Sequence, residues 1–366
     1  MKKNVLNLIT LVSLGATLLV LSLLFVFRAK DDVSYSERRA LKQFPKLSLA
    51  TVLSGEFMTD FETFALDQFP FRENFRTVKA LWQFSVLFQS DNNGIYVAEN
   101  SVSSIEYPLN ESSVLSAASK LNALYDLYLK NSNCKVYYSV IPDKNYFLAR
   151  AHGYPAMDYP RLVELFTSTV QNMEHIDIFP ALSASDYYRT DPHWRQEALT
   201  EVVAALALQM GFEPETSYTY ETLSGFYGAY YGQSALPIAA ETLTILHSPA
   251  IDSATVTNYE SGEITTVYDY EGYSGMDSYD IFLHGASPLM TIENPHSQSD
   301  AELIIFRDSF GSSLAPLLLD SYAKITLVDI RYISSAYVGE FVTFTDQDVL
   351  FIYSTTILNN SASLKD

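Results

Sequence analysis

Two short motifs combine the residue types that acyl-transfer chemistry needs. Residues 190–194 read Thr-Asp-Pro-His-Trp, so the Asp191 carboxylate comes two positions before the His193 imidazole. Residues 307–311 read Arg-Asp-Ser-Phe-Gly, and Ser309 lies where an apolar run gives way to a helical pattern. In a Ser-His-Asp site the imidazole takes the proton of the hydroxyl while the carboxylate orients the imidazole. The chain has only six histidines, so few other bases are available.

The position of Ser309 before an expected helix suggests how an oxyanion could be stabilised. Backbone N–H groups of Ser309 and Gly311 would lie at the positive end of the helix dipole. A capping role is the alternative, because Ser and Asp are both favoured helix N-caps. Asp191 could likewise cap the helix expected from Arg195, so the motifs alone leave both interpretations open.

A cation site is a further alternative. Asp191, His193 and Asp308 together offer two carboxylates and an imidazole, a set that suits Mn²⁺ or Zn²⁺ with open positions. Residues 311–313 lack the lysine of a phosphate-binding P-loop. We favour the acyl-transfer site, and the sequence predicts no resident metal or organic cofactor.

The elements that must position these residues alternate between strand and helix from about residue 91. Strands are expected at 94–97, 135–141, 176–179, 302–306 and 325–329, and helices at 112–129, 161–174, 195–210 and 311–319. Strands separated by helices imply a mostly parallel sheet covered by helices on both faces. The predicted fold class is therefore α/β.

Three polar residues follow the ends of these expected strands, namely Lys144, Ser309 and Arg331. Ligands of open α/β sheets bind outside the carboxyl ends of the strands. We therefore expect Lys144, Arg331 and the adjacent Tyr332 to bind the substrate. A structural ion pair with a nearby aspartate is the alternative for each cation.

The stretch from about 212 to 300 differs in composition, being rich in Tyr, Thr, Ser and Gly. Residues 241–246 and 263–268 alternate like strands, which predicts a β-rich insertion near the site. Its tyrosines could stack on sugars or form an aromatic core.

The N-terminus carries an apolar run from Val5 to Phe27, long enough to cross a bilayer as a helix. No small-residue cleavage site follows it, which favours an uncleaved anchor over a cleaved signal. We expect an anchor or signal at 1–28, a membrane-proximal helical segment at 29–90 and one large domain at 91–366. No other segment can span, so we expect a single-pass protein of the cell membrane with a cytoplasmic N-terminus and an extracytoplasmic body.

Composition excludes several classes of protein. The net charge of -20 disfavours nucleic acid or anionic lipid as a main partner, since phosphate binding needs concentrated positive charge. The single cysteine, Cys134, excludes an intramolecular disulfide framework. Apolar residues make up 48% of the 366, ample for a buried core.

A series of short pieces resembles the DHHW family of bacterial envelope proteins, which is similar to the alginate O-acetylation proteins with an SGNH-hydrolase-like domain. The pieces are residues 37–39 with 44–45, 67–70 with 72, 93–96, 142–145, 190–194, 285 with 292, 308–311 and 329–332. They cover most of the chain after the anchor, and their order is more specific than any one of them. The chain departs from the family's name motif at Pro192, where a histidine is usual.

This resemblance implies an SGNH-like domain in which Asp191, His193 and Ser309 act as carboxylate, base and nucleophile. Family membership implies no settled substrate, and we favour an O-acyltransferase or esterase that acts on a cell-envelope polysaccharide. The resemblance to the alginate acetylation proteins implies a membrane-embedded acyltransferase as a partner that supplies acetyl groups. A non-catalytic glycan-binding or scaffold protein on the same fold is the alternative, and a separation of Ser309 from His193 would favour it.

Overall fold

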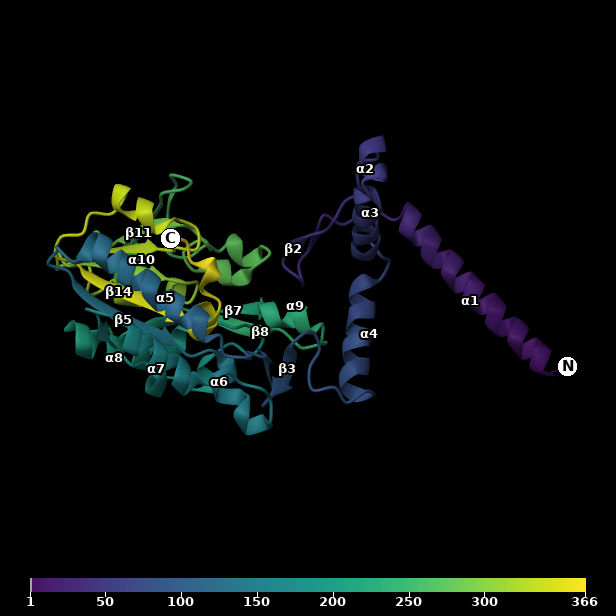
Figure 1. Ribbon diagram of the computed structural model, residues 1–366, viewed down its shortest axis with the longest axis horizontal. Coiled ribbons are helices and arrows are strands. Elements are labelled where there is room, and N and C mark those ends of the chain that lie inside the picture. Colours follow the sequence, from purple (N-terminus) through teal and green to yellow (C-terminus); the bar gives the residue numbers. More distant parts are fainter. Residues whose placement is uncertain (1) are drawn as a thin grey trace. The chain divides into compact units, whose positions relative to one another are not determined.

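The computed structural model describes residues 2–366, which form two compact units (Figure 1). The first ends at Gln89 and also includes Ala235–Pro237, and the second holds Ser90–Ser234 and Ile238–Asp366. Each unit is described by itself below.

The first unit begins with α1 (Lys2–Phe27), an apolar helix. Within it, Asn4–Phe27 is long and apolar enough to cross a membrane, by length and composition. None of its side chains in that window is buried against the rest of the described chain. The expected N-terminal apolar helix is therefore present.

Short elements follow, held together by ion pairs. They are β1 (Val33–Ser34), β2 (Arg39–Ala40), α2 (Leu49–Leu53), α3 (Glu56–Asp67) and α4 (Arg72–Ser85). The Arg39 guanidinium donates two hydrogen bonds, of 2.9 and 2.6 Å, to the buried carboxylate of Asp67. This contact lowers the pKa of Asp67 below its usual value. Glu37 pairs with Arg72 at 2.7 Å and with Arg76 at 3.3 Å. Two of the motifs that carry the resemblance therefore bind each other in this segment.

The second unit is built on an eight-stranded sheet. In the order of pairing its strands are β10 (Ile264–Thr265), β9 (Thr255–Asn258), β11 (Leu289–Glu293), β13 (Lys324–Val328), β12 (Glu302–Arg307), β14 (Asp348–Ser354), β5 (Lys135–Ile141) and β6 (Glu174–His175). The strands from β13 to β6 run parallel, whereas β11, β9 and β10 pair antiparallel. The predicted α/β fold with a mostly parallel sheet is confirmed.

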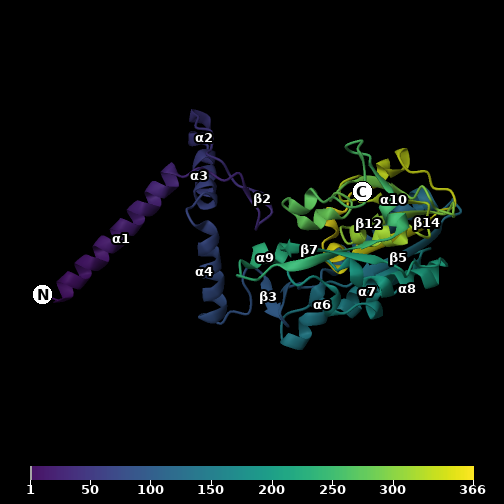
Figure 2. The same cartoon turned by 180° about the vertical axis from the view of Figure 1, so that it is seen from behind.

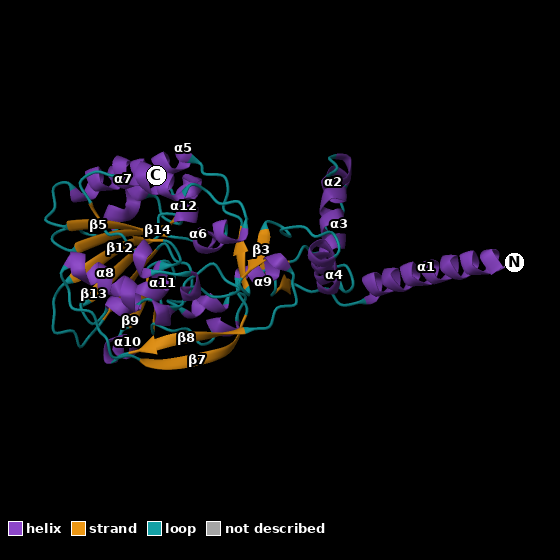
Figure 3. Cartoon of the chain, turned by 90° about the horizontal axis from the view of Figure 1, so that it is seen from below, coloured by secondary structure: helices purple, strands orange, loops and turns teal. Residues whose placement is uncertain are grey.

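Helices cover both faces of this sheet (Figure 3). Side chains of β12 alternate, so Leu303 and Ile305 enter one core while Ile304 and Phe306 enter the other. The first core is closed by α8 (Thr200–Met210), α10 (Pro249–Ser253) and α11 (Gly311–Leu314), and the second by α5 (Glu111–Leu124), α7 (Tyr159–Thr169) and α12 (Thr355–Asn359).

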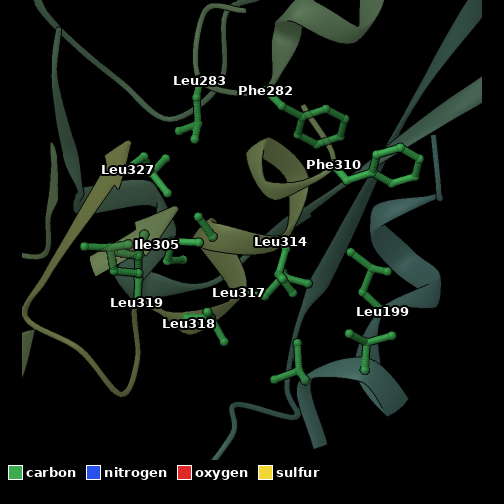
Figure 4. Close-up of a cluster of buried hydrophobic side chains, with 14 of the residues drawn as sticks. Leu199, Phe282, Leu283, Ile305, Phe310, Leu314, Leu317, Leu318, Leu319 and Leu327 are labelled. Carbon is green, nitrogen blue, oxygen red and sulfur yellow. The ribbon is translucent and has the colours of Figure 1, made fainter. Parts of the chain in front are cut away.

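The first core fixes the segment that follows Ser309. Leu314, Leu317 and Leu318 are fully or almost fully buried, and they pack with the strand residues Ile305 and Leu327 (Figure 4). The apolar burial of this turn holds it rigidly against the sheet.

The tyrosine-rich stretch is divided between two structures. Strands β7 (Thr219–Phe226) and β8 (Glu241–His247) form a separate antiparallel pair, visible from behind in Figure 2. Strands β9 to β11 instead extend the central sheet. The insertion is β-rich as predicted, but half of it belongs to the main sheet.

Several sequence-based boundaries were wrong, among them the following two. The helix expected from Arg195 begins only at Thr200, and Gln196–Ala198 form a 3₁₀ turn. The buried Gln196 side chain bonds the backbone of Ser313 and Leu246, so tertiary hydrogen bonds override the local helical pattern. The strand expected at 176–179 is instead the two-residue β6, which ends at His175.

Candidate active site

The structure brings the three candidate catalytic residues together at the carboxyl edge of the parallel strands. Ser309 follows β12 by two residues and is partly exposed. Its Oγ lies 2.7 Å from Nε2 of His193, and Nδ1 of His193 lies 2.6 Å from Oδ1 of Asp191. Ser309 and His193 are therefore within hydrogen-bonding distance of each other. A separation of the two would have favoured a non-catalytic binding protein.

The surroundings of Asp191 decide which ring nitrogen of His193 faces the serine as an acceptor. Asp191 is fully buried, and its carboxylate also accepts the backbone N–H groups of His193 at 3.1 Å and Ala229 at 2.8 Å. A carboxylate surrounded by N–H groups favours the tautomer in which Nδ1 carries the hydrogen. Nε2 is then free to accept the Ser309 proton.

The capping interpretations of both residues are wrong. Helix α11 begins at Gly311 with Phe310 as its N-cap and no side-chain capping bond. The Asp191 carboxylate bonds the His193 ring and Ala229 rather than the first turn of α8. Both side chains are therefore available for the arrangement with His193.

The cation alternative gains no support from the geometry. Asp308 accepts the backbone N–H groups of Phe310 at 3.1 Å and Ser354 at 2.8 Å, so its carboxylate ties the turn before Ser309 to the end of β14. Across residues 2–366, no group of three or more His, Cys, Asp or Glu side chains has the arrangement of a metal site.

Lys144 does not lie where a substrate could reach it, and its assignment as a substrate-binding residue is corrected. Lys144 is the first residue of α6 (Lys144–Leu148), and it is 1% exposed. Its Nζ donates to the carbonyl oxygens of Tyr188 at 2.9 Å, Arg189 at 3.1 Å and Asp191 at 3.0 Å. The Lys144 side chain therefore tethers the loop that carries Asp191 and His193 at three carbonyl oxygens, and Lys144 is a positioning residue.

The Lys144→Met substitution tests whether this side chain acts by positioning the loop that carries Asp191 and His193. The three loop carbonyls lose their donor, and we expect the rate of ester hydrolysis to fall roughly 10- to 100-fold because Asp191 and His193 shift. Burial lowers the pKa of Lys144 to about 7, although Asp191 and Glu241 raise it. The unfolded chain thus binds this proton more tightly, so the group's contribution to folding stability improves as pH rises from about 7 towards about 10.

Urea unfolding at the two ends of that pH range measures this contribution. The free energy of unfolding of the unaltered chain, minus that of the Lys144→Met variant, should increase with pH. Lys135→Met, at the exposed first position of strand β5, which precedes α6, is the matched control and should change neither the rate nor the pH dependence. A wild-type rate in the Lys144→Met variant would contradict the positioning role.

The tyrosine-rich stretch supplies a second set of supports for the same loop. Glu241, the first residue of β8, accepts the backbone N–H groups of Arg189 and Thr190, both at 2.7 Å. Gly228 packs so closely that a Cβ there would lie 2.3 Å from the Thr190 carbonyl and 2.4 Å from the Asp191 Cβ. Only glycine allows this approach, which brings the N–H of Ala229 to the Asp191 carboxylate.

Tyr279 fixes the plane of the His193 ring. The two rings are stacked with centroids 3.8 Å apart and an interplanar angle of 6°. The Tyr279 hydroxyl donates to Ser313 Oγ at 2.8 Å, and Trp194 Nε1 donates to the same oxygen at 2.9 Å. The imidazole is therefore held by Asp191 at one edge and by Tyr279 on one face.

The two predicted oxyanion donors differ in availability. The Ser309 N–H makes no hydrogen bond to any residue in the described part of the chain. The Gly311 N–H donates to the Asp308 carbonyl at 3.0 Å, so its prediction as an oxyanion donor is corrected. Gly311 has another function, because a Cβ at this position would lie 2.7 Å from the Cβ of buried Arg307.

Arg331 and Tyr332 follow β13 at the same edge of the sheet. Arg331 donates through Nε and Nη2 to Asp329, at 2.9 and 2.6 Å, so the expected ion pair is present. Tyr332 is exposed, and the Arg331 guanidinium lies 5.5 Å from its ring centroid. Substrate binding by these two residues stays a prediction.

Solved structures share this fold. A DHHW family protein from Eubacterium siraeum matches with a TM-score of 0.63 and 21% identity, over 75% of this chain and 97% of that chain. The chain has the fold of a DHHW family protein. PatB1 from Bacillus cereus, in a structure with a sulfonyl adduct, matches with a TM-score of 0.56 and 18% identity, over 72% of this chain and 97% of that chain.

A weaker structural match is the O-acetyltransferase domain of AlgJ from Pseudomonas putida, with a TM-score of 0.41 and 11% identity over 73% of this chain and 92% of that chain. No family model matches the sequence. No curated protein matches it either. The match to the Eubacterium siraeum structure confirms the DHHW resemblance drawn from short motifs at the level of the fold.

Sequence reasoning missed three supports of the site, namely Gly228, Glu241 and Tyr279. The tyrosine-rich composition indicated only that this stretch was unusual. A Gly-Ala pair at 228–229 carries no local sign that it will meet Asp191, which lies 38 positions away from Ala229. Such contacts depend on how the insertion folds back over the sheet.

Proposed function

We propose that this protein is an O-acyltransferase or esterase whose nucleophile is Ser309. The observation that carries the proposal is the contact chain from the Ser309 hydroxyl through His193 to buried Asp191. Removing the hydroxyl proton by an imidazole that a carboxylate holds in place is the usual route to an activated serine. The fold shared with PatB1, whose structure carries a sulfonyl adduct, agrees with an acylatable site.

The reaction would proceed in two halves. Ser309 Oγ attacks the carbonyl carbon of an ester donor and passes its proton to His193 Nε2. The tetrahedral oxyanion is stabilised by the free Ser309 N–H, and its collapse expels the donor alcohol, which takes the proton from His193. An acceptor hydroxyl then gives its proton to His193 and attacks the acyl-serine. The bond between the acyl carbon and Ser309 Oγ breaks, the acyl group stays on the acceptor, and His193 returns the proton to Ser309.

The acceptor decides between the two activities. Water gives an esterase, and a sugar hydroxyl of a cell-envelope polysaccharide gives a transferase. We propose the polysaccharide as the substrate, Arg331 and Tyr332 as residues that contact it, and a membrane-embedded acyltransferase as the supplier of acetyl groups. We also propose that α1 anchors the protein in the cell membrane with the body outside.

Pre-steady-state hydrolysis of p-nitrophenyl acetate by the full chain in detergent tests the activity. The proposal predicts a burst of p-nitrophenolate, stoichiometric with the protein, followed by slower turnover as the acyl-serine is hydrolysed. Adding a soluble cell-wall oligosaccharide should speed the second phase if the protein is a transferase. Release no faster than in buffer would contradict the proposal.

A further inference from the structure

Helix α4 in the first unit presents an apolar face that is at least half exposed. Phe75, Val78 and Trp82 recur at helical spacing, and they are 50%, 60% and 55% exposed. Ala80, on the other side of the helix, is fully buried. Large aromatic side chains along an exposed helix face mark a surface that meets another apolar phase.

The end of the apolar helix α1 contacts α3, the helix that precedes α4. The rings of Phe25, in the last turns of α1, and Phe64, in α3, have centroids 5.6 Å apart. The Asp31 backbone exchanges two hydrogen bonds with the Gln68 side chain, at 3.0 and 2.8 Å. If α1 crosses a bilayer, these contacts place α3 at the level of the membrane surface.

Helix α4 continues from that point. A short turn links it to α3, and the rings of Phe69 and Phe75 pack with centroids 5.7 Å apart. The exposed face of α4 therefore begins beside the aromatic cluster at the end of the span. That cluster also contains Phe44, whose ring contacts those of Phe57 and Phe61.

The distribution of charge separates this segment from the body. Residues 28–89 carry nine basic and eight acidic side chains, whereas residues 90–366 carry 12 basic and 35 acidic ones. A body with a net charge of -23 is repelled by anionic headgroups. The near-neutral segment 28–89 is not repelled in this way. Helix α4 itself has three basic residues and one acidic residue.

We propose that α3 and α4 lie in the outer headgroup layer of the membrane that α1 enters, with the apolar face of α4 against the acyl chains. The occupant of this face is therefore lipid. Phe and Trp side chains on one face and Arg and Lys elsewhere on the helix are the composition of helices that lie in a membrane interface. This contact does not depend on the reaction that the second unit performs.

The two tryptophans of the chain make the contact measurable. Trp82 lies on the α4 face, while Trp194 is fully buried in the second unit. The full chain is reconstituted into vesicles of phosphatidylcholine, with or without bromine atoms near the top of the acyl chains. We expect the brominated lipid to remove roughly half of the tryptophan emission, the Trp82 share. A Trp82→Phe variant should show none of this quenching.

A charge on the same face supplies the second test. Val78→Glu should lose most of the quenching, because a carboxylate disfavours burial in acyl chains. Leu208→Glu, at an 82% exposed leucine of α8 in the body, is the matched control and should quench like the unaltered chain. Thermal unfolding of the full chain, followed by its helical circular dichroism, checks that both variants remain folded.

Two outcomes would overturn the proposal. Quenching of Trp82 by aqueous acrylamide but not by brominated lipid would mean that the face is in water. Protection of Trp82 from both quenchers would mean that protein covers it, either the body of this chain or a partner.

Discussion

Ser309→Ala is expected to lower the kcat for ester hydrolysis by about 10³-fold or more. The variant lacks the oxygen that would form the acyl-enzyme, so hydrolysis cannot proceed through that intermediate. The site can then only stabilise the transition state for direct attack by water. The fold should tolerate the change, since it removes one hydrogen bond to His193 worth about 1 kcal/mol. Hydrolysis of p-nitrophenyl acetate and urea unfolding of the same preparation measure the two effects.

Ser119→Ala provides the matched control for that substitution. Ser119 is an exposed serine of α5 that bonds only the backbone of its own helix, and its replacement should leave kcat unchanged. Equal rates for the Ser309→Ala variant and the unaltered chain would remove Ser309 as the nucleophile.

Asp191→Asn should reduce kcat by about 10³- to 10⁴-fold. The carboxylate accepts hydrogens on both oxygens, from the His193 ring and backbone on one side and from Ala229 on the other. An amide can face only one of these sides with its oxygen, and its NH₂ group then opposes an N–H donor. The imidazole is left in the wrong tautomer or displaced from Ser309, and the rate at each pH measures the loss.

His193→Gln removes the base without altering the carboxylate, so it tests the same pair if Asp191→Asn destabilises the fold. Asp126→Asn, which makes the same chemical change at an exposed position of the segment after α5, is the control and should retain full activity. A fully active Asp191→Asn variant would mean that the carboxylate has no role in orienting His193.

The parts of the site that could be predicted from the sequence are those fixed by local pattern. The apolar run at 302–306 predicts a buried strand, and the pattern from Gly311 predicts a helix. These two patterns place Ser309 in the turn between the strand and the helix. Parallel strands bring their carboxyl ends to one edge, and that rule also placed Lys144 and Arg331 correctly at the edge of the sheet. The Asp191–His193 spacing made this pair a candidate, and the family resemblance favoured it as the partner of Ser309.

The parts that could not be predicted depend on burial and long-range packing. A lysine after a strand suggests a substrate contact, and only the fold shows that Lys144 is buried against three loop carbonyls. The Gly311 amide was expected to be free, but the tight turn after Asp308 uses it. Tyr279 stacks on His193 from a position 86 residues further along the chain, and its own neighbours give no sign of that contact.

The most direct test of the central claim is the mass of the protein after a brief reaction with p-nitrophenyl acetate, quenched in acid. If Ser309 is the nucleophile, the intact chain gains one acetyl group, and fragmentation places it on the peptide that contains Ser309. The Ser309→Ala variant should gain none. An acetyl group found elsewhere, or an equal gain by the variant, would contradict the account.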